Sequence, residues 1–189
     1  MECICRQGAA ARGERCRHVN HPTETCLVCD TWADYFVGNG DARYISKDEA
    51  KDLLRRAERE GLLIETANTD STDTICMCCS CCCGPLKLLR ASAGAARDYA
   101  GNYVCVKDEA LCTHCLKCTE RCVTDALVKA ENGKPALAAG KCVGCGLCVS
   151  ACPAKALKLV VKPEAKLNIP FRTVDELQSR LAEERLAES

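Results

Sequence analysis

The chain has 189 residues, enough for one domain or two small ones, and twenty of them are cysteine. Lysine plus arginine and aspartate plus glutamate each number 26, so the formal net charge is zero and nucleic acid is not expected as the main partner. Four tyrosines, two phenylalanines and one tryptophan cannot build a large aromatic core, so disulfides or metal must help to hold the fold together.

Sequence signals for export or membrane insertion are not found. The N-terminus, MECICRQGAAARGERC, has no apolar run of signal-peptide length, and no run of about 18 apolar residues occurs anywhere. We therefore expect a cytoplasmic protein without a membrane span, a location that is compatible with a place at the periphery of a membrane complex. In the reducing cytoplasm, patterned cysteines usually bind metal.

The first cysteine group lies at the N-terminus and is accompanied by arginines. Its members are Cys3, Cys5, Cys16, Cys26 and Cys29. The arginines Arg6, Arg12, Arg15 and Arg17 either offset the charge of thiolate-bound metal or form a solvated face, and we prefer the second interpretation. His18 and His21 also lie in this region.

Residues 30–75 contain no cysteine and read as ordinary folded protein. A short helix is expected from Asp30 to Phe36. Ser46 and Glu49 form a capping box for a second helix that runs to about Glu60 and ends at Gly61. Residues 62–66 then read as a strand.

The second cysteine group follows and leads into a connector. Its members are Cys76, Cys78, Cys79, Cys81, Cys82 and Cys83. Residues 84–102 are rich in glycine and alanine and read as a connector around a short helix at 85–91. Cys105 stands apart between Val104 and Val106, so we expect it in a buried strand and not among metal ligands.

The third group contains eight cysteines in a duplicated spacing. The spacing C-x2-C-x2-C-x3-C occurs twice, thirty residues apart, at Cys112, Cys115, Cys118 and Cys122 and again at Cys142, Cys145, Cys148 and Cys152. The second copy ends in Cys152-Pro153 and has Gly144 and Gly146 between its cysteines, where the first copy has His114 and Leu116. This pattern resembles the bacterial two-cluster ferredoxins over residues 103–161.

The resemblance implies two 4Fe–4S clusters with crossed ligands. Three thiolates come from one tight loop, and the fourth comes from the other half of the repeat. One cluster would be held by Cys112, Cys115, Cys118 and Cys152. The other would be held by Cys142, Cys145, Cys148 and Cys122. His114 is either a group coupled to the first cluster or, as we prefer, a tolerated surface side chain.

The N-terminal half carries a second resemblance. The runs CICRQ, PTETC and ICMCCSCCCG, with ARYISKDEAKDLLRRAEREGLLIETAN between them, resemble a group of anaerobic bacterial proteins described as 4Fe–4S ferredoxin-type. That resemblance covers nearly the whole chain. It implies ten N-terminal metal ligands: Cys3, Cys5, Cys16, Cys26, Cys76, Cys78, Cys79, Cys81, Cys82 and Cys83. Cys29 and Cys105 depart from the pattern.

The number and type of N-terminal centres stay open. Neighbouring cysteines in an extended segment point to opposite sides, so Cys78-Cys79 and Cys81–Cys83 suit a segment between two metal centres. Two further 4Fe–4S clusters would use eight of the ten thiols, and two non-cubane clusters with five thiolates each would use all ten. Zinc is the alternative, held by Cys3, Cys5, Cys26 and Cys29, with His18 or His21 as an optional ligand.

The tail is expected to be separate from the cluster scaffold. Thr173 and Glu176 cap a helix that runs to about Ala187, with Leu177 and Leu181 on one face. This face suits a partner's groove or the chain's own N-terminal domain. We therefore expect an α+β protein with three parts: a cysteine-rich, partly helical domain at 1–102, a bacterial-ferredoxin-like domain at 103–161, and a linker with a docking helix at 162–189.

The expected function is electron transfer through iron–sulfur clusters in anaerobic metabolism. The partner would be a redox enzyme or a multi-subunit oxidoreductase complex, and the chain reads as a carrier or subunit and not as a stand-alone enzyme. No catalytic residues, phosphate loop or dinucleotide fingerprint are found. Two alternatives stay open: a non-cubane N-terminal cluster that performs two-electron chemistry on a thiol or disulfide, and a redox-sensing or zinc-stabilised interaction module.

Overall fold

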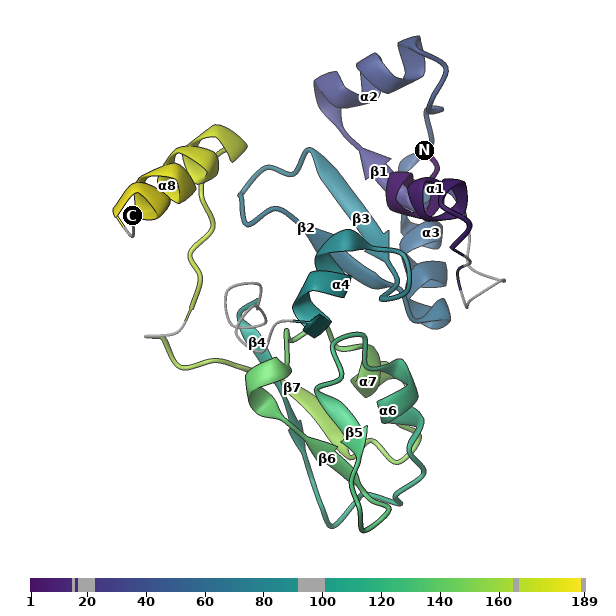
Figure 1. Cartoon of the computed structure of the whole chain (residues 1–189), viewed down its shortest axis with the longest axis vertical. Coiled ribbons are helices and arrows are strands. Elements are labelled where there is room, and N and C mark those ends of the chain that lie inside the picture. Colours follow the sequence, from purple (N-terminus) through teal and green to yellow (C-terminus); the bar gives the residue numbers. More distant parts are fainter. Residues whose placement is uncertain (15, 17–22, 92–100, 165–166, 188–189) are drawn as a thin grey trace.

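The computed structural model describes residues 1–14, 16, 23–91, 101–164 and 167–187. Its architecture is mixed α+β, with small sheets and short helices in two neighbouring parts and one further helix to the side (Figure 1). The predicted connector is described only at its ends, because residues 92–100 lie outside the described ranges. His18, His21, Arg15 and Arg17 lie outside them as well.

The N-terminal part is a three-stranded antiparallel sheet with helices around it. Its elements are α1 (Ile4–Ala11), β1 (Cys26–Val28), α2 (Asp30–Gly38), α3 (Lys47–Glu60), β2 (Leu63–Thr66), β3 (Thr74–Cys78) and α4 (Gly84–Ala91). The strand order is β1-β3-β2, so the strand that begins the second cysteine group is central in the sheet. Of the first cysteine group, Cys3 and Cys5 lie at the start of α1, Cys26 begins β1, and Cys29 precedes α2.

Helix α3 forms where its capping signals predict. The Ser46 hydroxyl accepts a hydrogen bond from the Glu49 backbone N–H at 3.1 Å. The Glu49 carboxylate does not complete the predicted box in the expected way, since it forms an ion pair with Arg43 at 2.6 Å. Gly61 ends the helix in the left-handed conformation, with φ 81°. The strand that follows begins at Leu63, one residue later than predicted, and Leu62 is fully buried.

The C-terminal part is a duplicated unit. Its elements are β4 (Tyr103–Lys107), α6 (Lys117–Arg121), β5 (Leu127–Lys129), β6 (Pro135–Leu137), a 3-10 turn (Ala139–Lys141), α7 (Leu147–Ser150) and β7 (Leu157–Val161). Strands β4 and β7 pair antiparallel, as do β5 and β6. In each half a cysteine loop leads into a short helix and then into a strand. This repetition in structure matches the repetition in sequence.

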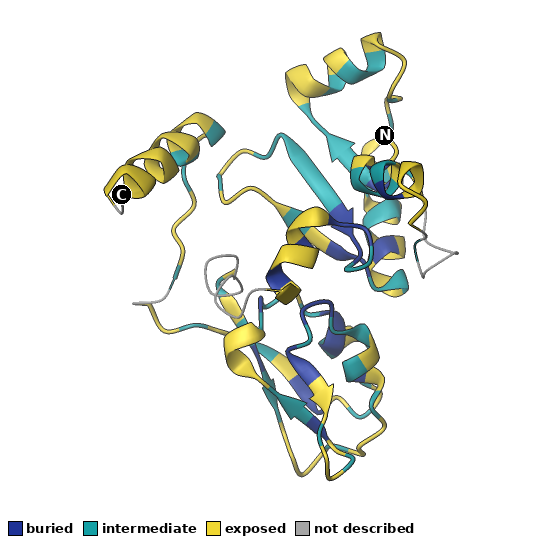
Figure 2. Ribbon diagram, viewed as in Figure 1, coloured by how far each residue is buried: buried dark blue, intermediate teal, exposed yellow. Residues whose placement is uncertain are grey.

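The two parts share a hydrophobic core. Leu63, Leu86 and Leu89 of the N-terminal part lie in one buried cluster with Val123, Val143 and Leu147 of the C-terminal part. In Figure 2, α4 carries buried positions where it lies between the two parts. The boundary near residue 102 therefore stays a prediction, because residues on its two sides bury each other.

Polar contacts strengthen the same junction. Arg90 at the end of α4 forms an ion pair with Asp125 at 2.7 Å. Arg121 at the end of α6 donates to the backbone carbonyls of Glu58 and Arg59 in the last turn of α3. A cation at a helix C-terminus interacts favourably with the unpaired carbonyls there. The contact thus fixes α3 relative to the C-terminal part.

Helix α8 (Val174–Ala187) lies beside the rest of the chain and has no buried residue. The Thr173 hydroxyl accepts from the Glu176 N–H at 3.2 Å, as the predicted cap requires. The segment before it is tied to the β2–β3 connection, since the Asp70 N–H donates to the Phe171 carbonyl at 2.7 Å. Leu177 and Leu181 line a groove with residues of β2 and of the Cys142 loop, so the apolar face of α8 faces its own chain.

Deleting residues 174–189 is expected to leave the iron content of the protein unchanged. The segment contains no cysteine and no fully buried side chain among the residues that are described. Iron per chain and the visible absorption spectrum, measured anaerobically on the full and shortened chains, test this. Loss of iron from the Cys142 loop would show that α8 supports the scaffold. A docking role for α8 stays a prediction.

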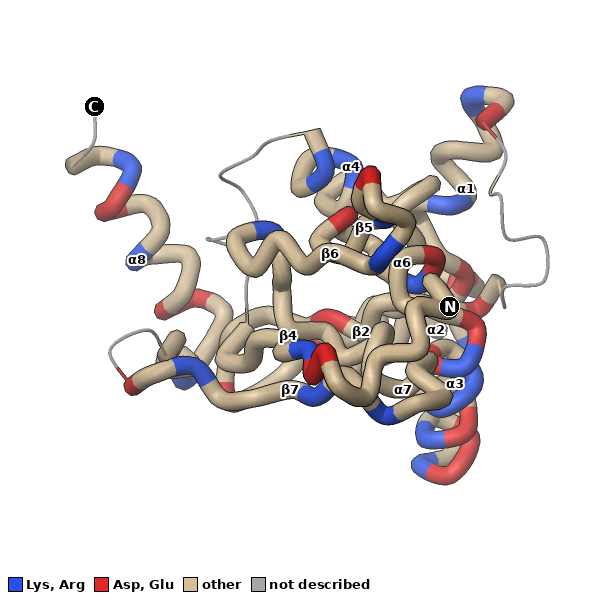
Figure 3. The backbone as a smooth tube through the Cα atoms, turned by 90° about the horizontal axis from the view of Figure 1, so that it is seen from below, with Lys and Arg blue, Asp and Glu red and all other residues tan. Residues whose placement is uncertain are grey.

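Charges of both signs alternate on the exposed helices, as Figure 3 shows for α3 and α8. On α3, Lys51 pairs with Asp48 at 3.0 Å and Arg55 with Asp52 at 2.9 Å. Such exposed pairs contribute about 0.3–0.5 kcal/mol each. None of the helices in the described ranges is long and apolar enough to cross a membrane.

Candidate metal centres

The first predicted ferredoxin set converges on one small cavity. Cys112 and Cys115 reach it from the loop before α6, Cys118 reaches it from α6, and Cys152 reaches it from the chain that follows α7. The other residues that line the cavity include Ala154, Ala156 and Leu157. Thiols that surround an enclosed, largely apolar space can hold a cluster and limit its contact with water.

The second predicted set converges on a matching cavity. Its thiols come from Cys142, Cys145 and Cys148 in one half and from Cys122 in the other. The sulfur of Cys122 accepts backbone N–H groups of Ala126 at 3.2 Å and Leu127 at 3.3 Å. The side chains of the eight cysteines therefore lie together in the two crossed sets that the resemblance implies. That they bind metal stays a prediction.

Backbone N–H groups lower the pKa of thiols in these sets, whereas burial raises it. The backbone N–H of Lys117 interacts with Cys115 and lowers the pKa of its thiol. Burial raises the pKa of the Cys118 thiol, because the charged form loses hydration. A bound cation would favour the thiolate at both positions, since thiolate is the form that ligates metal.

The loops adopt left-handed backbone at corresponding positions of the two halves. Gly144 has φ 76° and Gly146 has φ 80°, and His114 and Leu116 have φ 55° and 62°. A Cβ added to Gly144 would meet the carbonyl carbon of Tyr103 at 2.8 Å and its oxygen closer still. His114 is exposed, so the first half tolerates a side chain where the second half does not.

Replacing Gly144 with alanine is therefore expected to abolish metal binding at the Cys142 loop. Backbone atoms of β4 would have to move to make room, which is costly in a paired strand. His114→Gly is the matched control: it should retain all iron and relieve about 1 kcal/mol of left-handed strain. Iron per chain and thermal unfolding of both variants test the pair. Full iron content in Gly144→Ala would contradict the steric argument.

Cys105 lies in a buried strand, as predicted. It is 2% exposed in β4 and belongs to the core of the C-terminal part. Its sulfur lies 3.6 Å from that of Cys148, and it lines the cavity of the second set. Cys105 thus lies beside the predicted ligand Cys148, but it is not one of the eight cysteines of the duplicated spacing.

The cysteines of the second group are divided between two separate groups of thiols, but a turn after β3, and not alternation along an extended segment, produces most of the division. Along β3, residues 76 and 78 share one face of the sheet, and the chain then turns, with the Cys83 N–H donating to the Cys79 carbonyl at 3.1 Å. This turn sends Cys79, Cys81 and Cys82 to one side and Cys78 and Cys83 to the other.

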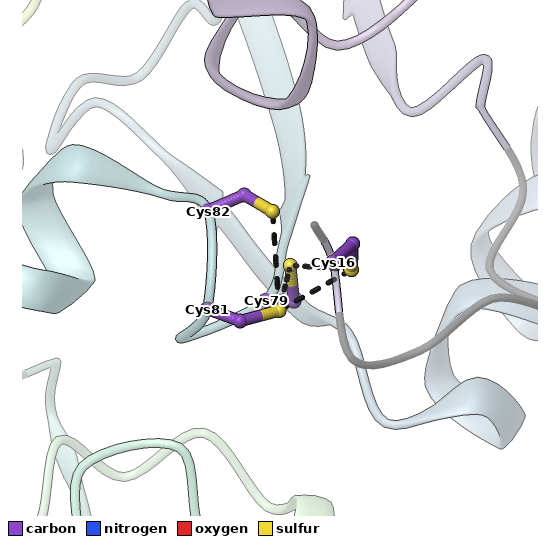
Figure 4. Close-up of side chains that lie close together, drawn as sticks. All are labelled: Cys16, Cys79, Cys81 and Cys82. Carbon is purple, nitrogen blue, oxygen red and sulfur yellow. Dashed lines mark hydrogen bonds between the residues drawn. The ribbon is translucent and has the colours of Figure 1, made fainter. Parts of the chain in front are cut away.

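The four-thiol group consists of Cys16, Cys79, Cys81 and Cys82 (Figure 4). The four sulfur atoms all lie within 4.8 Å of one another. Three come from the turn between β3 and α4, and Cys16 reaches them from the chain that follows α1. Cys79 and Cys82 are buried and the other two are half-buried.

The six-thiol group consists of Cys3, Cys5, Cys26, Cys76, Cys78 and Cys83, linked by successive side-chain contacts. Interaction with the sulfurs of Cys76 and Cys83, together with burial, raises the pKa of the Cys78 thiol. Interaction with Cys26, together with burial, raises the pKa of Cys3. Hydrogen bonding with Cys26 lowers the pKa of the Cys76 thiol, and hydrogen bonding with Cys78 lowers that of the Cys83 thiol. A bound cation would replace the protons that these neighbouring thiols share.

Glu65 joins the six-thiol group, and sequence reasoning missed it. Its carboxylate lies 3.0 Å from the Cys78 sulfur and 3.9 Å from that of Cys83, and burial raises its pKa. In β2, Glu65 lies on the same face of the strand as the buried Leu63, and it is the register partner of Cys76 in β3. A charged residue on the buried face of a strand beside the cysteine strand was the signal that could have identified it.

The ten thiols lie in one group of four and one group of six. Cys3, Cys5 and Cys26 of the zinc alternative belong to the six-thiol group, and Cys29 does not. The number and type of the metal centres stay predictions. Cys29 contacts no other thiol in the described part of the chain; it precedes α2, where burial and the charges of Asp30 and Asp73 raise its pKa.

The described arginines near the first cysteine group differ in their exposure and contacts. Arg12 is 60% exposed in its side chain and pairs with Glu14 at 2.9 Å, as a solvated face requires. Arg6 differs, since it is half-buried, donates to the Thr25 hydroxyl at 3.5 Å and interacts with Cys79. The preference for a solvated face is therefore wrong for Arg6.

Comparison with known proteins identifies one region of the chain. A family model described as a 4Fe-4S dicluster domain matches residues 104–153, a range that contains all eight cysteines of the duplicated spacing. No curated protein matches the chain. Residues 104–153 thus form an iron–sulfur domain of ferredoxin type, which supports a role in electron transfer.

Proposed function

We propose that this protein carries electrons between redox enzymes of anaerobic metabolism, with the six-thiol group as a further iron–sulfur site beside the dicluster domain. The partners would be a redox enzyme or a multi-subunit oxidoreductase complex in the cytoplasm. A 4Fe–4S cluster, when bound, supplies one-electron chemistry at low potential. The chain's own residues hold, bury and align the sites.

The shared core between the two parts carries this proposal. Cys78 and Cys83 of the six-thiol group lie in the same buried cluster as Val123, Val143 and Leu147. Each of these three residues is the sequence neighbour of a predicted ligand of the second ferredoxin set: Cys122, Cys142 or Cys148. Packed apolar side chains of one buried cluster therefore connect the two sites.

The dicluster domain continues this succession of sites. Cys118 of the first set and Cys148 of the second share one core with Leu127 and Leu157. Cys115 and Cys145 are exposed, so each set has one edge near the surface. A carrier needs such an edge for exchange with partners and a buried contact for exchange within the chain.

Counting electrons in the full chain tests the proposal. Anaerobically purified protein, titrated with a one-electron reductant and followed by electron paramagnetic resonance, should take up more electrons than two clusters accept. Cys83→Ser should reduce that number and lower the iron content while leaving the dicluster signals in place. Cys29→Ser is the control, because this cysteine contacts no thiol within the described residues. Wild-type uptake equal to that of two clusters would overturn the N-terminal redox site.

A further inference from the structure

The four-thiol group differs in its geometry from the two predicted ferredoxin sets, because its four sulfur atoms lie close together. Cys81 lies 3.2 Å from Cys16 and 3.2 Å from Cys79 between sulfur atoms. The Cys16–Cys79 separation is 3.7 Å and the Cys81–Cys82 separation is 3.9 Å. Figure 4 shows the four side chains pointing toward one another.

These separations of 3.2–3.9 Å are close to the edges of a tetrahedron around one ion. A metal–sulfur bond of about 2.3 Å places tetrahedral thiolates about 3.8 Å apart. In a cubane, each thiolate binds a different iron at a different corner, so the sulfurs are held farther apart. The eight ferredoxin cysteines provide an internal reference, because in the described residues none of them belongs to a group this tight.

The surroundings of the four-thiol group suit a closed site. Its buried members pack with Ala57, Leu62 and Met77, and Cys16 and Cys81 pack against the same core. Four thiolates around a divalent ion carry two net negative charges. The guanidinium of Arg6 interacts with Cys79 and lies near Cys16, where it offsets part of that charge.

We propose that Cys16, Cys79, Cys81 and Cys82 bind a single divalent ion, zinc, as a structural site separate from the iron–sulfur centres. Four thiolates in tetrahedral geometry select zinc or iron, and zinc is the usual occupant of closed sites with four protein ligands. The ion would tie the chain after α1 to the turn between β3 and α4. It would thereby hold α1 against the sheet that carries the six-thiol group.

Metal analysis and X-ray absorption of the anaerobically purified full chain test this proposal. We expect one zinc per chain, with four sulfur neighbours at about 2.3 Å and no metal neighbour. Cys16→Ser should lose the zinc, because Cys16 supplies one of its four ligands. It should keep the iron, because Cys16 belongs to neither the six-thiol group nor the ferredoxin sets. Cys16→His should retain zinc with three sulfur and one nitrogen neighbours. Cys29→Ser should change neither metal.

The outcomes separate the possible occupants. If the wild type holds one mononuclear iron in place of zinc and Cys16→Ser loses it, the single-ion site is supported and its metal is iron, not zinc. Loss of several irons per chain in Cys16→Ser, from a wild type without zinc, identifies a cluster and overturns the proposal. Unchanged metal content in Cys16→Ser overturns it as well. If Cys16→Ser does not fold, the absorption spectrum of the wild type decides the question alone.

Discussion

Replacing Cys122 with serine is expected to remove the cluster of the Cys142 loop and to spare the cluster of the Cys112 loop, which lies nearer in sequence. The thiol of Cys122 lines the cavity formed by Cys142, Cys145 and Cys148. Two backbone N–H groups fix its sulfur there. Iron should fall by about four atoms per chain, the content of one cubane.

Double variants identify which cluster is lost. Cys122→Ser combined with Cys145→Ser should lose no more iron than either change alone, because both act on one site. Cys122→Ser combined with Cys115→Ser should lose about twice as much, since two sites are affected. Cys105→Ala is the matched control, a buried cysteine beside Cys148 outside the fourfold spacing, and should keep its iron. Additive loss with Cys145→Ser would contradict the crossed assignment.

Removing all metal is expected to unfold the N-terminal part. Both thiol groups lie within its hydrophobic core, with Cys78 and Cys83 in one buried cluster and Cys79 and Cys82 in another. A structural metal site contributes about 10–16 kcal/mol of apparent binding free energy. That is as large as the entire stability of a typical domain, about 5–15 kcal/mol. We therefore expect residues 1–83 to lose their fold when the metal is removed.

Circular dichroism and hydrogen exchange of the anaerobic protein, before and after treatment with a strong chelator, measure this effect. Amides of α3 and β3 should lose protection to the level of an unfolded chain. Zinc and iron returned to the stripped protein should restore the protection. A circular dichroism spectrum that stays unchanged after complete metal removal would show that the core does not depend on metal.

The sequence alone was sufficient for features that depend on neighbouring residues. Helix α3 and the start of α8 follow from capping residues three positions apart, because those hydrogen bonds are local. The crossed side-chain sets of the ferredoxin part were implied by the resemblance of the duplicated spacing to two-cluster ferredoxins, and the structure brings the same thiols together. Two sides were also expected for the cysteines at 78–83, although a turn and not an extended segment separates them beyond Cys79.

Only the tertiary structure decided how the N-terminal thiols are divided. Cys26 and Cys29 are three residues apart, but Cys26 contacts Cys3 and Cys76 while Cys29 precedes α2. The pairing of β2 with β3 brings Glu65 beside Cys78, and the chain after α1 brings Cys16 to the four-thiol group. These contacts join residues far apart in sequence, and their formation depends on the strand order and on a core shared between two parts. Spacing within a segment carries no information about either.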